Sequence, residues 1–424
     1  MPAVVIANWP LYVGMLLLMV GNGLQASLLG VRGTEAGFST AGISAVMSAY
    51  FAGVLLSSMV TPRLIRRVGH VRVFAALGSA ISAALILFPA LADPIAWSLL
   101  RAVVGFCFCG VYITAESWLN NSTTSANRGS ALSAYMVVQM TGVVAAQGLL
   151  SLDDPTGFIL FIIPSVLVSI SFAPILLSVS PAPTFESTKN MNLRDLYRAS
   201  PLGLASMFLM GGIFSAQFGM SAVYATEIGL DAARLSIFLS AFYVGGVVCQ
   251  IPLGWLSDRL PRRRLILAVA AGGAVGAGIG LAAGGAFWGI TAAAFLVGGC
   301  ANPLYPLLLA YVNDAVEYED MAAAAGGLLF VNGLGAILGP VALGGALGAL
   351  GPSGFWAFCG ALLAAIALYA ALRMVRRPTQ VTGEAVAFTP VFPAASAVAV
   401  EAACEAGEPL AADARESEGN PEAA

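Results

Sequence analysis

Two ionisable residues, Arg101 and Glu116, lie within and at the end of one long apolar stretch of the chain. A charge at bilayer depth is costly unless it faces water or a partner, so it marks a functional site by default. Fifteen residues span about 22 Å along a helix, so the two side chains cannot pair directly. Two alternatives stay open: Arg101 could extend its side chain to the nearer membrane surface, and Glu116 could be a solvated carboxylate at a helix end.

Uncharged polar side chains are sparse inside the apolar stretches, where each amide needs a partner. Asn302 is favoured for solute contact because Pro303 and Pro306 follow it, and prolines remove helix hydrogen bonds and free backbone carbonyls. Hydrogen bonding between helices is the alternative for these residues. The predicted substrate cavity candidates are Asn22, Gln25, Gln139, Gln217, Asn302, Tyr305 and Asn332.

The sequence contains none of the residue groups that enzymes or metal sites require. It has six cysteines without zinc-type pairs, a single histidine and no phosphate-binding glycine loop. Paired carboxylates, Cys with His, or metal ligands at membrane depth are also lacking. We therefore expect no enzymatic activity, no metal, no cofactor and no nucleic-acid partner, and any driving force must come from a gradient.

The composition indicates a helical membrane protein that spans the bilayer many times. Of 424 residues, 59% are apolar and 10% charged, against roughly 45–50% and about 25% in soluble domains. Apolar runs of a length to span lie near 10–30, 41–61, 73–92, 95–115, 130–150, 157–178, 202–224, 235–256, 265–284, 287–312, 323–346 and 354–373. These runs predict an all-α protein of twelve transmembrane helices, six in each half.

The intervals between the runs define the domain organisation. A six-helix bundle is predicted over 1–178, a polar linker over 179–200 and a second bundle over 201–377. The acidic tail, 378–424, is rich in Ala, Glu, Pro and Gly and is expected to be disordered and cytoplasmic. Of the 19 Lys and Arg residues, 16 fall on the side of the linker and the termini, which predicts that both termini are cytoplasmic.

An internal repeat supports two pseudo-symmetric halves. An offset of 192 or 193 residues lays Gly105 on Gly298 and Tyr112 on Tyr305, in matching spans and at matching depths. Parallel repeats of six helices are the arrangement of major facilitator transporters, which bind substrate between the repeats.

Three segments resemble signatures of that superfamily. The most specific is GWLSDRLPRRR, residues 254–264, which is similar to its cytoplasmic loop signature; RAVVG, residues 101–105, is similar to a signature associated with proton-coupled transport. ESWLN, residues 116–120, resembles a poorly characterised bacterial branch. The first implies a latch in which carboxylates and arginines pair when the cytoplasmic side closes. The gating candidates are Gly254, Asp258, Arg259, Arg262, Arg263, Arg66, Arg67, Arg128 and Asp314.

The resemblance implies a monomeric secondary active transporter in a bacterial inner membrane, with the lipid bilayer, a small solute and protons as its partners. It would move the solute by alternating access, with Arg101 and Glu116 coupling transport to protons. Because few charges are buried, we expect a neutral, amphipathic or mono-anionic organic molecule. An uncoupled facilitator and a transport-inactive membrane sensor are the alternatives.

Overall fold

A computed structural model of the chain describes residues 8–123, 125–154, 157–176, 192–257, 259–316, 320–376 and Val398. Within these residues, eleven helical segments are long and apolar enough to cross a membrane, and Ile159–Pro174 is a shorter apolar helix. Together they confirm the twelve predicted spans and the all-α fold class. The predicted tail lies outside the described residues except Val398, whose half-buried side chain packs against the core.

The helices fall into two sets of six spans. The first half forms α2 (Trp9–Glu35), α3 (Thr40–Val68), α4 (His70–Ala90), α5 (Pro94–Asn121), α6 (Ser125–Leu149) and α7 (Ile159–Leu176). The second half forms α9 (Pro201–Ser215), η1 (Ala216–Met220), α10 (Ser221–Glu227), α11 (Ala232–Ser257), α12 (Arg262–Ala282), α13 (Phe287–Asn313), α14 (Met321–Leu350) and α15 (Ser353–Arg376). A short helix, α8 (Leu193–Ala199), lies within the predicted linker.

Several helices extend beyond the apolar runs because polar residues at their ends satisfy free backbone groups. The Ser39 side chain accepts from the amide of Gly42 at the start of α3, and Asp93 accepts from two amides at the start of α5. Gly69, with φ of 86°, separates α3 from α4 in a conformation that favours glycine.

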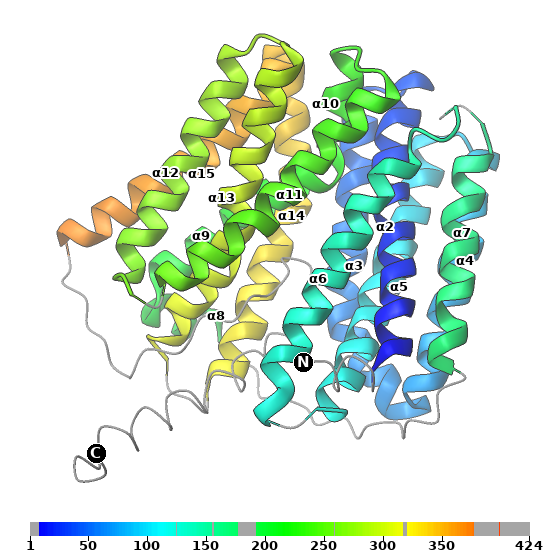
Figure 1. Cartoon of the computed structure of the whole chain (residues 1–424), viewed down its shortest axis with the longest axis horizontal. Helices are drawn as coiled ribbons and strands as arrows, with labels where there is room; N and C mark the ends of the chain where they lie inside the picture. The colour runs from blue at the N-terminus through cyan, green and yellow to red at the C-terminus, as the bar shows by residue number, and fades with distance from the viewer. Residues whose placement is uncertain are drawn as a thin grey trace.

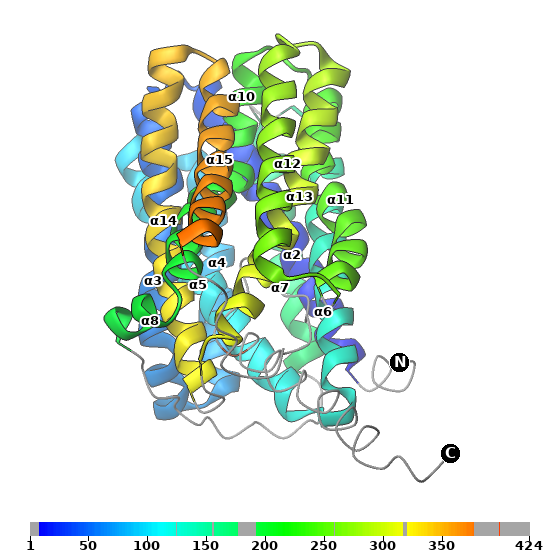
Figure 2. The ribbon, with the colours of Figure 1, turned by 90° about the vertical axis from the view of Figure 1, so that its left-hand side faces the viewer.

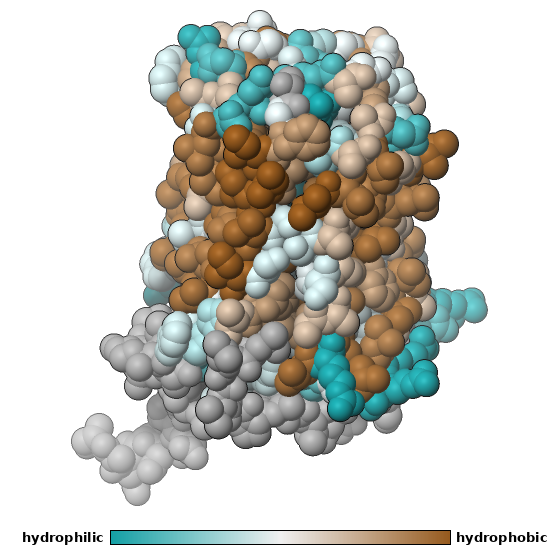
Figure 3. Space-filling view, turned by 90° about the vertical axis from the view of Figure 1, so that its right-hand side faces the viewer, coloured by the Kyte–Doolittle hydropathy of each residue, from teal (hydrophilic) through white to brown (hydrophobic). Residues whose placement is uncertain are grey.

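The surface fits a bilayer. Figure 3 shows a broad hydrophobic belt on one side of the molecule, with hydrophilic residues at both ends. Large apolar side chains such as Ile95, Trp288 and Ile251 are exposed, whereas Arg101 and Gln25 are fully buried. A soluble protein would show the reverse distribution.

The two halves lie side by side, as Figure 1 shows, and Figure 2 views the molecule from the side of the second half. Across the interface, α3 packs against α14, α6 against α11, and α2 against η1 and α10. The connections between α3 and α4 and between α11 and α12 lie at the same end of the molecule, which we call the arginine-rich end. We call the other end of the molecule the opposite end. In Figure 1, α6 and α11 diverge toward the arginine-rich end at the bottom of the view.

Contacts between the halves close the opposite end. The backbone at Gly30 of α2 approaches Ala222 and Gly219 so closely that a Cβ would lie within 3.2 Å of atoms in both. A Cβ at Gly344 would collide with the Ser44 hydroxyl of the other half. Small residues allow helices to approach this closely in a membrane.

The repeat appears in the packing of each half. A Cβ at Gly105 would collide with the backbone oxygen of Tyr50, and one at Gly298 with that of Phe242, at the matching contact of the second half. The close approach of α3 to α5 therefore recurs between α11 and α13.

Replacing Gly105 by alanine should destabilise the protein by about 1–3 kcal/mol, because the new methyl group overpacks a helix contact formed by backbone. The midpoint of thermal unfolding in detergent measures the effect. Gly278→Ala in α12 is the matched control, since nothing lies within 4 Å of its added Cβ; its midpoint should be unchanged or higher. Equal midpoints for the two variants would contradict the packing of α3 on α5.

Candidate functional site

Arg101 lies inside the first bundle, where its side chain is fully buried. Its Nη1 donates to Oε1 of Gln25 at 2.7 Å, and its Nη2 donates to Sδ of Met47 at 3.5 Å. The guanidinium carbon lies 4.5 Å from the centre of the Tyr50 ring, within the range of a cation–π contact. In this structure Arg101 therefore lies in the interior of the bundle and does not extend to the membrane surface.

Two further sequence candidates continue this network. Gln25 Nε2 donates to Oδ1 of Asn22 at 3.1 Å, and Asn22 Nδ2 donates to the hydroxyls of Tyr50 at 3.2 Å and Tyr112 at 2.7 Å. Helices α2, α3 and α5 thus hold one connected group of buried polar side chains around the guanidinium. Such networks fix the positions of their members when each is satisfied.

Within the described residues, the positive charge of Arg101 has no acidic partner. The described ion pairs join Arg198 with Asp195, Arg234 with Asp231 and Arg262 with Asp314. Every contact of the Arg101 guanidinium is to a neutral group, and its Nε has no hydrogen-bond partner in the described part of the chain. A buried charge compensated only by dipoles is costly.

The second half meets this network through η1, the π-helical middle of the seventh span. The ring of Phe218 lies 5.6 Å from that of Tyr50, and the Cβ of Gly219, were one present, would lie 2.8 Å from Sδ of Met47. Gln217, a cavity candidate, lies in the same turn; it is buried, and among the described residues its Nε2 has no partner. Single π-helical turns are frequent at functional sites.

Glu116 belongs to a second polar group, nearer the arginine-rich end. Its side chain is 2% exposed and accepts a hydrogen bond from the Tyr135 hydroxyl at 3.3 Å. Tyr135 also has Gln139 in hydrogen-bonding reach, and Tyr305 of the second half lies within electrostatic range of Glu116. Glu116 is therefore not a solvated carboxylate, and three sequence candidates from both halves converge here.

The amides of Asn302 and Asn332 bridge neighbouring helices of the second half. Asn302 Nδ2 donates to the backbone oxygens of Phe242 and Gly298, at 3.3 and 3.0 Å, and Asn332 Nδ2 donates to that of Met207 at 3.1 Å. Helix α13 is continuous through Pro303 and Pro306, neither of which has an amide N–H to donate within it. Its packing against α11 and α12 holds the segment in place.

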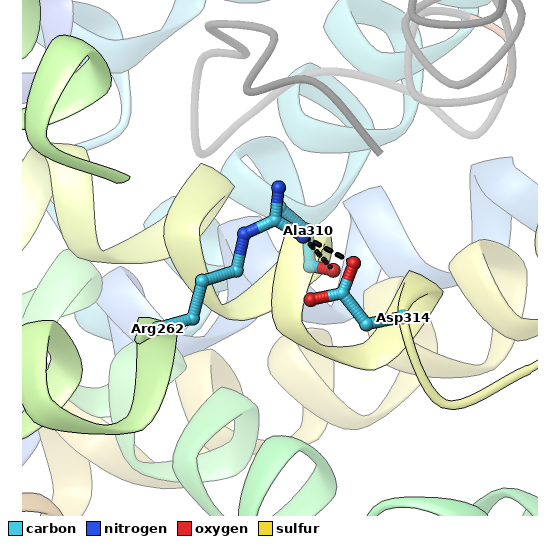
Figure 4. A network of polar contacts seen from close by, with 3 residues as sticks. All are labelled: Arg262, Ala310 and Asp314. Atoms are coloured by element: carbon cyan, nitrogen blue, oxygen red, sulfur yellow. Dashed lines mark hydrogen bonds and ion pairs between the residues drawn. The ribbon is translucent and has the colours of Figure 1, made fainter. Parts of the chain in front are cut away.

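At the arginine-rich end, Arg262 links two helices of one half (Figure 4). Its Nη1 donates to the backbone oxygen of Ala310 at 2.9 Å and forms an ion pair with Asp314. Arg263 beside it donates to the Tyr311 hydroxyl at 2.8 Å. The described contacts of these arginines therefore join α12 to the end of α13.

The remaining gating candidates lie apart from this pair. Arg259 stacks on Trp255 with its guanidinium carbon 4.0 Å from the ring centre, and Gly254 is buried in α11. Arg66 and Arg67 are exposed at the end of α3. Asp258 and the Arg128 side chain lie outside the described residues.

Some residues that contact the candidate site residues in the structure were not predicted from the sequence. These are Met47, Tyr50, Tyr112, Tyr135 and Phe218. The match of Tyr112 with Tyr305 in the repeat was one available signal. The others have ordinary membrane side chains, and only their contacts with Arg101, Asn22, Glu116 or Tyr50 mark them.

Comparison with known proteins decides the family. The model of the Major Facilitator Superfamily matches residues 11–231 and 202–401. The chain belongs to this superfamily. Among curated relatives, an uncharacterised MFS-type transporter, YcaD of Salmonella newport (strain SL254), is 25% identical over 331 residues, which cover 77% of this chain and 85% of the relative.

Solved transporter structures share the fold. A point variant of the nucleoside transporter NupG superimposes with a TM-score of 0.74 at 15% identity, covering 86% of this chain and 99% of that one. A bacterial homologue of the human lysosomal transporter Spinster, inward-facing and unoccupied, gives 0.66 at 14% identity, covering 95% and 98%. By its family together with this fold, the chain is a multi-pass transmembrane transporter of two six-helix bundles, and not an enzyme.

Changing Asp314 to Asn should destabilise the second half by about 1–3 kcal/mol, because it removes the charged member of the ion pair that Asp314 forms with the buried Arg262. The thermal unfolding midpoint reports this loss. Asp195→Asn removes the partner of Arg198 from an exposed pair, which should cost at most about 1 kcal/mol. If the Asp314 variant unfolded no earlier than this control, the ion pair would not hold α12 to α13.

Proposed function

We propose that the protein is a secondary active transporter of a bacterial inner membrane, which moves a small organic solute by alternating access with coupling to protons. The observation that carries the proposal is the buried Arg101 network, which lies where α3 meets η1 of the other half. A membrane protein places a charge there when the charge acts on a solute or ion. The solute would contact the cavity candidates from both halves, including Gln25, Gln139 and Gln217.

The arginine-rich end faces the cytoplasm in this proposal, because 16 of the 19 basic residues lie on that side. Both termini would then be cytoplasmic. The proposed domains are bundles over 1–178 and 201–377, joined by the linker 179–200 and followed by the tail 378–424. A monomer is sufficient, since both halves of the solute site come from one chain.

Closure at the opposite end supports an inward-facing conformation. Contacts of Gly30 with Ala222 and of Gly344 with Ser44 join the halves there, while α6 and α11 diverge at the other end (Figure 1). The solved Spinster homologue has the same fold and is described as inward-facing. Rocking of the halves about the midplane would open the opposite end and close the cytoplasmic end.

The cytoplasmic latch belongs to the other conformation. Gly254 with Asp258, Arg259, Arg262 and Arg263 would form it on the second half, and Arg66, Arg67 and Arg128 on the first. Asp314 now pairs with Arg262 of its own half. When the halves close at the cytoplasmic end, Asp314 would exchange Arg262 for an arginine of the first half.

Glu116 is the proposed proton carrier. Its carboxyl group is 2% exposed and accepts a hydrogen bond from Tyr135 of α6, so it is enclosed between helices of the first half. Among the described residues, Tyr112, Tyr135, Tyr305 and Cys109 are titratable side chains that interact with it. Arg101 stays charged throughout and would act on coupling through its field and its hydrogen bonds.

Substrate-dependent pH change inside proteoliposomes tests the proposal. With a metabolite and drug panel and an imposed gradient, the wild type should move protons with at least one compound. Glu116→Gln should reduce this movement by about tenfold or more, in the range of a lost general acid–base group, while solute exchange without a gradient persists. Glu35→Gln, at an exposed carboxylate, is the control and should behave as the wild type.

Three results would contradict the proposal in different ways. Proton movement retained in Glu116→Gln would exclude Glu116 as the carrier. Tracer equilibration without any proton movement would show an uncoupled facilitator. Absence of both, with folded protein in the vesicles, would favour a transport-inactive sensor.

A further inference from the structure

The guanidinium of Arg101 is only partly used by the protein. Guanidinium carries five N–H donors in a planar fork, and the described contacts engage one donor with an amide oxygen and one with a sulfur. Sulfur is a weak acceptor, and the Nε has no partner within the described residues. The donors that remain are of the kind that hold a planar anionic group.

The charges around Arg101 define what such a group must carry. On its own helix the nearest acids are Asp93 and Glu116, eight and fifteen residues away, or about 12 and 22 Å along the axis. No described ion pair includes Arg101. One negative charge on a solute would neutralise the site, whereas a dianion would leave a charge uncompensated in a low-dielectric interior.

Aromatic rings continue from the guanidinium into the other half. Tyr50 lies under the guanidinium, the Phe218 ring lies 5.6 Å from that of Tyr50, and Phe214 stacks on Phe218 at 5.7 Å. Phe51 joins the cluster, with its ring 6.1 Å from that of Phe214. Such rings prefer stacked or edge-on contacts with other flat groups, so a flat apolar body is the kind of group that they would contact.

Met47 and Tyr50 cover the guanidinium, and their positions depend on the contact between the halves at the opposite end. Met47 lies against Gly219, and Tyr50 against Phe218, so both contact η1 of the second half. When the halves separate there, η1 withdraws and these contacts are lost. The flexible Met47 can then leave the guanidinium, so that Arg101 is available in the outward-facing conformation and covered in this one.

We propose that Arg101 binds the charged group of the transported solute, and that this solute is an organic monoanion with a flat apolar body. The inference rests on the transporter function proposed above and names its substrate class. Gln25 and Asn22 position the guanidinium, and the rings of Tyr50, Phe51, Phe214 and Phe218 contact the apolar body. Met47 and Tyr50 replace the anion when the opposite end closes.

Binding of benzoate to the full-length protein in detergent tests this site without requiring transport. Sodium benzoate, neutral benzamide and disodium phthalate are titrated at constant ionic strength, and the thermal unfolding midpoint is followed. Benzoate should raise the midpoint saturably, at concentrations roughly tenfold lower than benzamide or phthalate, which corresponds to one charge-assisted contact. Benzamide or phthalate that matched benzoate would overturn the proposal.

Two substitutions locate the site. Arg101→Lys keeps the charge but loses the planar fork, and should weaken benzoate binding roughly tenfold or more. Arg198→Gln removes an equal charge from an exposed pair and should bind as the wild type. Unchanged binding in Arg101→Lys would overturn the assignment, and if that variant failed to fold, the comparison of three ligands on the wild type would still decide.

Uptake of labelled benzoate into proteoliposomes separates this inference from the transporter proposal. Saturable binding with uptake supports both. Binding of benzoate without its uptake would overturn the proposed transport of this solute class and would leave the anion site in place. Proton-coupled uptake of a neutral solute, with no benzoate binding, would overturn the anion site and leave the transporter proposal.

Discussion

The first half is organised around a buried guanidinium that has no carboxylate partner among the described residues. Arg101 cannot lose its proton, so its charge must be solvated by the protein itself. Gln25, Tyr50 and Met47 supply an amide oxygen, a ring face and a sulfur. This solvation is incomplete, since Nε lacks a partner in the described chain. An anion could accept hydrogen bonds from the N–H groups that the protein leaves without a strong acceptor, and this is a physical reason for the site to bind one.

The two halves share the same helix packing, but only the first half carries a buried charge at the matching position. Glycine contacts bring α3 onto α5 and α11 onto α13 in the same way. At the positions that match Arg101, however, the second half has Ala293 and Ala294, both fully buried. The charge thus comes from the first half, whereas the rings of η1 come from the second, so that relative motion of the halves changes the surroundings of one cation.

Much of the fold was predictable, because bilayer thickness fixes the length of each apolar run. The depth of Arg101 and the pairing of the halves followed from the same pattern. Contacts set by packing were not predictable: π-helical η1 has no distinct sequence signal, and Asn302 precedes two prolines that α13 accommodates without a break. The contact of Glu116 with Tyr135 joins two different helices, so the order of residues along one span cannot reveal it.

The central claim is that the halves separate at the opposite end and thereby uncover Arg101. The separation can be measured in a variant in which the six native cysteines are replaced. Spin labels are attached at Glu35→Cys and Leu350→Cys, which are both exposed at that end, and pulsed electron paramagnetic resonance gives the distance between them. The account predicts two distances, with the longer one more populated after benzoate is added and unchanged by benzoate in Arg101→Lys. A single distance that does not respond to benzoate in either protein would contradict it.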